Sequence, residues 1–129
     1  MAHKTNYHVS RIGHEQNDWE RGIAFYQDDL KILEHRLQDI SQMYSKEEVK
    51  SQVEHFQNQF IIQQKNLLDL NQHIKIHVRH VNEDVIERAQ HLTDQTIAEH
   101  DQLKEAYFML ERTILDLRHD FYRFLSHYI

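Results

Sequence analysis

The chain has 129 residues, and its 15 lysine and arginine residues stand against 21 aspartate and glutamate residues, for a formal net charge of −6. It contains no cysteine, which excludes disulfide bonds, thiolate catalysis and thiolate zinc sites. It shows neither the basic stripe typical of nucleic-acid-binding proteins nor an apolar run of the roughly 18 residues that a transmembrane helix needs. We therefore expect neither nucleic acid nor membrane as a partner.

The composition favours long helices joined by few loops. Proline is absent and Gly13 and Gly22 are the only glycines, so strong turn signals are missing. The length fits one domain with a sizeable core. The N-terminal segment lacks the apolar stretch of a signal peptide, which, together with the absence of cysteine, favours a cytoplasmic location.

Residues 1–16 are polar, and we expect them to form a flexible N-terminal arm in front of a single helical-bundle domain, residues 17–129. Asn17 is a preferred helix N-cap, and Glu20 lies three residues on, as in a capping box. The following apolar residues alternate in steps of four and three, which predicts a helix that buries one face: Trp19, Ile23, Tyr26, Leu30, Leu33, Leu37, Ile40 and Tyr44.

A second capping box, Ser45 with Glu48, follows at once and predicts that the next helix begins there and runs antiparallel to the first. Its seam keeps the same spacing from Val49 to Val81, with Gln63 and His77 in two of the apolar places. Because both flanking segments carry the same pattern, this helix is expected to be the centre of the bundle.

The seam breaks after Val81. We interpret residues 82–93 as a connection that contains a short helical segment; the alternative is that the second helix continues through a stutter. The last helix is predicted to start near Thr93 or Asp94, with the seam Leu103, Tyr107, Leu110, Ile114, Leu117, Phe121, Phe124 and Tyr128. The predicted fold is all-α, an antiparallel bundle of three long helices.

Antiparallel neighbours bring residues of constant index sum to one level, which pairs Phe56 with Phe121 and places His77 level with Gln16 and His100. His73 and His77 are four residues apart, so their imidazoles can share a divalent metal ion. A metal site of His73, His77 and His100, completed by Gln16, His14 or Glu99, is one hypothesis for this level. The alternative is a wet, polar end of the bundle. The twelve histidines also allow self-association to change with pH.

Each helix carries a second, thinner apolar stripe, which on the first helix consists of Phe25 and Ile32. A three-helix bundle needs only one buried face per helix, so the extra stripes predict a homodimer interface. The expected interface residues are Ile61, Leu68, Phe108, Leu115, Tyr122 and Leu125.

No pattern predicts a catalytic site. The Glu-x-x-His motif of di-iron bundles is absent, as is a glycine-rich phosphate loop, and no serine has the sequence setting of a nucleophile. We therefore expect a non-enzymatic, self-associating helical module that also binds an unidentified protein partner. A histidine-rich metal-binding bundle is the alternative.

Two segments, Phe25-Tyr26-Gln27-Asp28-Asp29-Leu30 and Val53-Glu54-His55-Phe56-Gln57-Asn58-Gln59-Phe60-Ile61, resemble a family of short bacterial helical proteins of unknown function. The likeness extends from Trp19 to the C-terminus. This resemblance implies a helical bundle and no particular activity.

Overall fold

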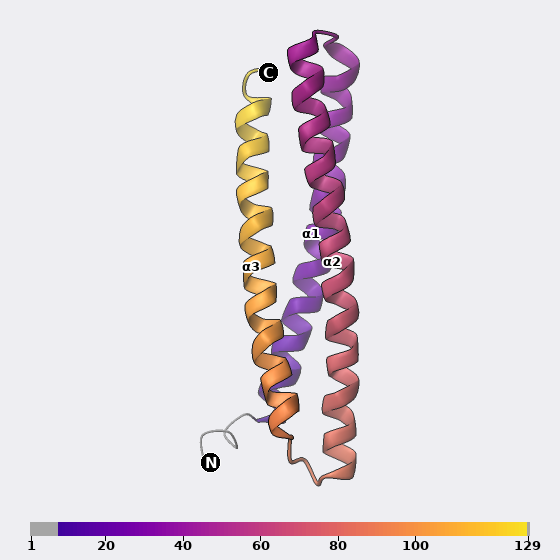
Figure 1. Ribbon diagram of the computed structural model, residues 1–129, viewed down its shortest axis with the longest axis vertical. Coiled ribbons are helices and arrows are strands. Elements are labelled where there is room, and N and C mark those ends of the chain that lie inside the picture. Colours follow the sequence, from indigo (N-terminus) through magenta and orange to yellow (C-terminus); the bar gives the residue numbers. More distant parts are fainter. Residues whose placement is uncertain (1–7, 129) are drawn as a thin grey trace.

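The computed structural model describes residues 8–128 and shows three long helices: α1 (Val9–Met43), α2 (Glu47–Glu87) and α3 (Asp94–Leu125). Helices α1 and α3 run in the same direction and α2 runs against both (Figure 1). The predicted all-α bundle is therefore confirmed. The start of α1 and the α2–α3 connection lie at one end of the bundle, which we call the 88–93 end. None of these helices is long and apolar enough to span a membrane, as far as residues 8–128 are concerned.

Helix α1 begins at Val9, eight residues before the start that the sequence predicted at Asn17. The predicted arm, residues 1–16, is therefore wrong for residues 9–16, whereas residues 1–7 lie outside the described part of the chain. Ile12 is fully buried and Gln16 is 5% exposed, so the seam extends by two further places in the same four-and-three spacing. A glutamine in one of those places concealed the extension.

The first connection is as short as predicted, with Tyr44 closing α1 and Lys46 preceding α2. The capping box expected from Ser45 is not formed, because Lys46 is the N-cap and no side chain bonds to the cap. Glu47 and Glu48 nevertheless lie in the first turn of α2, where carboxylates interact favourably with the positive end of the helix dipole.

Helix α2 does not stop at Val81 but continues to Glu87, as the alternative interpretation held, so residues 82–93 contain no separate helical segment. The seam continues through Asp84, a buried carboxylate that accepts hydrogen bonds from the Thr93 backbone N–H at 3.2 Å and its hydroxyl at 3.5 Å. Thr93 in turn caps α3 by accepting from the Thr96 N–H at 3.1 Å, which confirms the predicted start. Asp84 thus fastens the α2–α3 connection to the end of the bundle.

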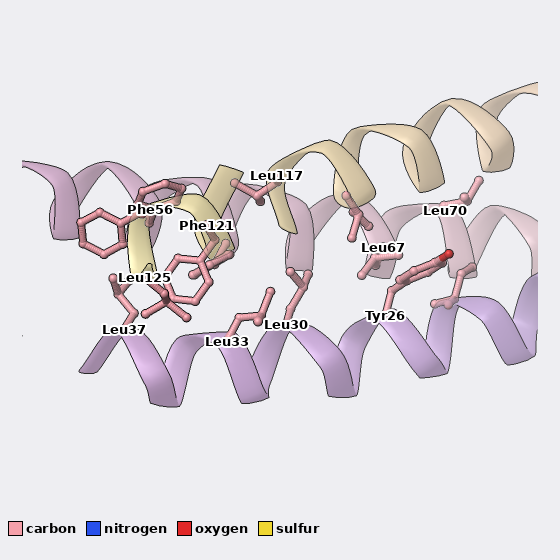
Figure 2. Packing of buried hydrophobic residues seen from close by; sticks show 14 of the residues in the cluster. Tyr26, Leu30, Leu33, Leu37, Phe56, Leu67, Leu70, Leu117, Phe121 and Leu125 are labelled. Carbon is pink, nitrogen blue, oxygen red and sulfur yellow. The ribbon is translucent and has the colours of Figure 1, made fainter. Parts of the chain in front are cut away.

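The hydrophobic core runs through the middle of the bundle in the register that the sequence predicts. Phe56 meets Phe121 with ring centroids 5.3 Å apart, and Phe60 meets Phe121 at 5.1 Å, both edge-to-face. Figure 2 shows side chains from all three helices pointing into one interior, among them Tyr26, Leu30, Leu33, Leu37, Phe56, Leu67, Leu70, Leu117, Phe121 and Leu125.

Gly22 permits a close approach between α1 and α3. A Cβ atom at this position would overlap the Tyr107 hydroxyl and lie 2.9 Å from its ring carbon Cζ. Gly13, in the same helix, has nothing within 4 Å of such an atom. The two glycines therefore serve different roles, although both lie within α1.

Replacing each glycine by alanine should change stability in opposite directions. Gly13→Ala should stabilise the fold by up to about 1 kcal/mol, the difference in helix propensity. Gly22→Ala should destabilise it, because displacing the buried Tyr107 ring costs about 1–3 kcal/mol, more than the propensity gain. Urea unfolding of the two variants checks this, and equal shifts in the same direction would contradict the close packing.

Candidate functional site

A polar layer crosses the bundle near the 88–93 end. His77 on α2 and His100 on α3 are both fully buried, and His77 Nε2 lies 2.9 Å from His100 Nδ1. The sequence predicted that these two residues share a level, and the structure confirms it. Because both imidazoles are buried, their ring nitrogens need hydrogen-bond partners within the protein.

A carboxylate lies at each end of this histidine pair. Glu15 Oε1 on α1 is 2.7 Å from His100 Nε2, and Glu99 Oε1 on α3 is 2.7 Å from His77 Nδ1. These distances are those of charge-assisted hydrogen bonds. The four side chains form a continuous row, Glu15–His100–His77–Glu99, that links all three helices. We call it the histidine–glutamate array.

Two basic side chains flank the array on its solvent sides. Lys104 Nζ lies 3.1 Å from Glu15 Oε2, and His80 Nδ1 lies 3.0 Å from Glu99 Oε1. Beneath the array, the ring of Trp19 packs on His100 with centroids 4.7 Å apart. The array is thus buried in its centre and open to water only at its two carboxylates, whose side chains are 21% and 31% exposed.

The protonation states follow from these contacts. Burial lowers the pKa of His77, and the neighbouring His100 lowers it further, against the opposing effect of Glu99. Burial alone would raise the pKa of Glu99, but the hydrogen bonds from His77 and His80 outweigh it and the pKa falls. Burial likewise opposes the hydrogen bonds of Glu15, and its pKa is lowered by His100 and Lys104. Both carboxylates are therefore ionised near neutral pH.

The structure brings together only part of the predicted metal-ligand set. His77 and His100 meet, and Glu99 joins them, whereas His73 is exposed on α2 and takes no part in the array. Within residues 8–128, no group of three or more histidine, aspartate or glutamate side chains is arranged to hold a metal ion. A metal bound between His77 and His100 would have to replace their mutual hydrogen bond.

Glu15, which α1 contributes to the array, was not among the residues predicted from the sequence. The residue fell within the predicted arm, because Gln16 conceals the apolar spacing there. Extending the four-and-three spacing back from Trp19 to Ile12 would have placed Glu15 on the helix, beside Gln16. Gln16 itself is buried, and its Nε2 has no hydrogen-bond partner.

A second feature lies on the surface where α1 meets α3. Tyr26 donates a hydrogen bond to Glu111 Oε2 at 2.7 Å, and Asp29 Oδ2 forms an ion pair with Arg118 Nε at 3.4 Å. Tyr107 of α3 fits against Gly22 of α1, as described above. These contacts define the line along which the two parallel helices touch.

Large apolar side chains lie on both sides of this line. On α1, Phe25 lies three residues after Gly22, and Ile32 lies three residues after Asp29, so both are on the same side of the helix as these contact residues. The side chains of Phe25 and Ile32 are 58% and 55% exposed. On α3, Phe108, Leu115 and Tyr122 alternate in the same way with Glu111 and Arg118 and are 52%, 44% and 38% exposed. We call the set of Phe25, Ile32, Phe108, Leu115 and Tyr122 the apolar strip.

The predicted interface residues divide among three environments. Phe108, Leu115 and Tyr122 belong to the apolar strip. Ile61 and Leu68 are exposed on α2, on the side that faces α1, where Gln64 Nε2 donates to the Gln27 carbonyl at 3.1 Å. Leu125 is only 4% exposed and lies in the core (Figure 2), so its prediction as an interface residue is wrong.

Comparisons with protein-family models, with curated proteins and with solved structures found no match to this chain. The likeness to short bacterial helical proteins therefore rests on the two sequence segments alone.

Proposed function

We propose that the protein is a non-enzymatic, self-associating helical bundle, and that two copies pair through the apolar strip. The observation that carries this proposal is the spacing of the strip. Five large apolar side chains from two helices flank the line where α1 and α3 touch, and each is more than a third exposed. Isolated exposed apolar residues are normal in monomers, whereas a repeated row on two neighbouring helices is typical of an interaction surface.

A second copy is the occupant that suits this surface, because a two-fold axis across the strip lays its apolar side chains on the same side chains of the other copy. The charged groups beside the strip already have partners within one copy: Asp18 pairs with Arg21 at 2.6 Å, and Arg118 pairs with Asp29 at 3.4 Å. Arg36 and Arg118 also stand around Tyr122, with guanidinium carbons 5.9 and 5.4 Å from its ring centroid.

The substitution Leu115→Glu should give a folded monomer. Leu115 is in the middle of the α3 half of the strip, and a carboxylate there would be buried without a partner in the dimer but hydrated in the monomer. Leu68→Glu is the matched control, since Leu68 is 51% exposed on a different side of the bundle. Light scattering after size exclusion should report one chain for Leu115→Glu and two chains for Leu68→Glu, with equal helicity by circular dichroism.

A monomeric Leu68→Glu variant alongside a dimeric Leu115→Glu variant would move the interface to the α1–α2 side. If both variants stay dimeric, the exposed apolar side chains tested are not the contact, and the proposal fails.

A further inference from the structure

The histidine–glutamate array has a fixed demand for protons. It contains one contact between nitrogens, 2.9 Å long, and two contacts between nitrogen and oxygen, each 2.7 Å long. At such distances two facing lone pairs repel, and so do two facing N–H groups, so each contact needs one proton. Three contacts therefore hold three protons.

These three protons lie on the four ring nitrogens of the histidine pair, because both carboxylates are ionised. One imidazole is then neutral and the other is an imidazolium. Burial lowers the pKa of His77, so His77 is the neutral member and donates through Nδ1 to Glu99. His100 is the cation and donates to His77 and to Glu15. The face of Trp19 against His100 is a favourable neighbour for that charge.

The unfolded chain holds a different number of protons on the same groups. With an ordinary imidazole pKa of about 6.5, two unfolded histidines carry two protons in mild alkali and four in mild acid. Folding should thus take up one proton above about pH 7 and release one below about pH 6. The folded state is favoured most between these limits.

We propose that the array is a pH-sensitive latch, which holds the three helices together most tightly near about pH 6.5 and loosens on either side. A fourth proton on the histidine pair would make two N–H groups face each other between His77 and His100. Loss of the third proton would leave two lone pairs facing each other in one of the three contacts. Either change breaks a contact that joins α3 to α2 or to α1. The latch is independent of the proposed dimer.

The groups that face the histidine pair do not alter this proton count. From α1 the facing group is Glu15, from α2 it is His80, and from α3 they are Glu99 and Lys104. His80 donates to Glu99 through Nδ1 whether the ring is neutral or charged.

The test is urea unfolding of the wild type and His77→Gln from about pH 5 to about pH 8.5. A glutamine at position 77 can accept a hydrogen bond from His100 and donate one to Glu99. The variant therefore keeps the His100 imidazolium but lacks the second imidazole, which must stay neutral in the folded wild type. The ratio of the two unfolding constants should be flat above about pH 7 and change about tenfold per pH unit below about pH 6, with the wild type losing stability. In the double variant His77→Gln/His100→Gln, the loss of stability above about pH 7 should vanish as well.

The exposed His73 supplies the control, because His73→Gln should follow the wild type at every pH. Parallel profiles of wild type and His77→Gln in acid would overturn the latch. Should the glutamine variants fail to fold, ring ¹⁵N spectra of the wild type near neutral pH decide the matter. Three protonated nitrogens among the four of His77 and His100 support the latch, and two would refute it.

Discussion

Phe121→Ala is expected to lower the free energy of unfolding by about 3–5 kcal/mol, the usual cost of emptying a buried aromatic site. Phe121 is fully buried and packs edge-to-face against Phe56 and Phe60, so no neighbour can fill the space without leaving its own contact. Because α3 would lose its main attachment to α2 at this level, the loss should be near the upper part of that range.

Phe108→Ala is the matched control, since it makes the same change on the same helix at a side chain that is 52% exposed. Both substitutions should be made in Leu115→Glu, so that self-association does not contribute to the measured stability. Urea unfolding should then show a change within about 0.5 kcal/mol for Phe108→Ala. Similar losses in the two variants would contradict the register of the core.

Glu15→Leu should cost about 3 kcal/mol near neutral pH, because it removes the carboxylate that balances a buried imidazolium. The remaining His100 would lose either its proton or its Nε2 partner, and Lys104 would lose its ion pair. The loss should grow as the pH falls through the ordinary imidazole range, since the unfolded chain then gains a proton that the folded variant resists.

Adding His100→Leu to Glu15→Leu should restore part of that stability. A leucine beside Trp19 needs no proton and no counter-charge, so the second substitution removes the group that the first left unpaired. A double-mutant cycle measures this coupling by urea unfolding. Additive losses would show that Glu15 and His100 do not act as a pair.

The sequence predicts this fold well wherever apolar residues mark the seam. Phe56 and Phe121 meet as their index sum requires, and the same arithmetic brings His77 to His100. It fails where a polar residue occupies a seam position near the end of a helix. Gln16 concealed the first two turns of α1, and Asp84 concealed the last turns of α2.

The candidate sites were predictable only in part, for a physical reason. Heptad spacing determines the level of a residue in the bundle but not which helices pack side by side. The assignment of Phe108 and Leu115 to one surface with Phe25 became clear only from the contacts between α1 and α3. Leu125 lies seven residues after Arg118, in the row of α3 residues that faces α1 rather than in the strip, and it is buried in the core.

The most direct test of the central claim, pairing through the apolar strip, is sedimentation equilibrium of the unmodified chain over a wide concentration range near neutral pH. The proposed pairing predicts a mass of two chains that falls toward one chain on dilution, because each strip residue is already partly buried and adds only part of the roughly 1.5–3 kcal/mol of full burial. A mass of one chain at every concentration would contradict it.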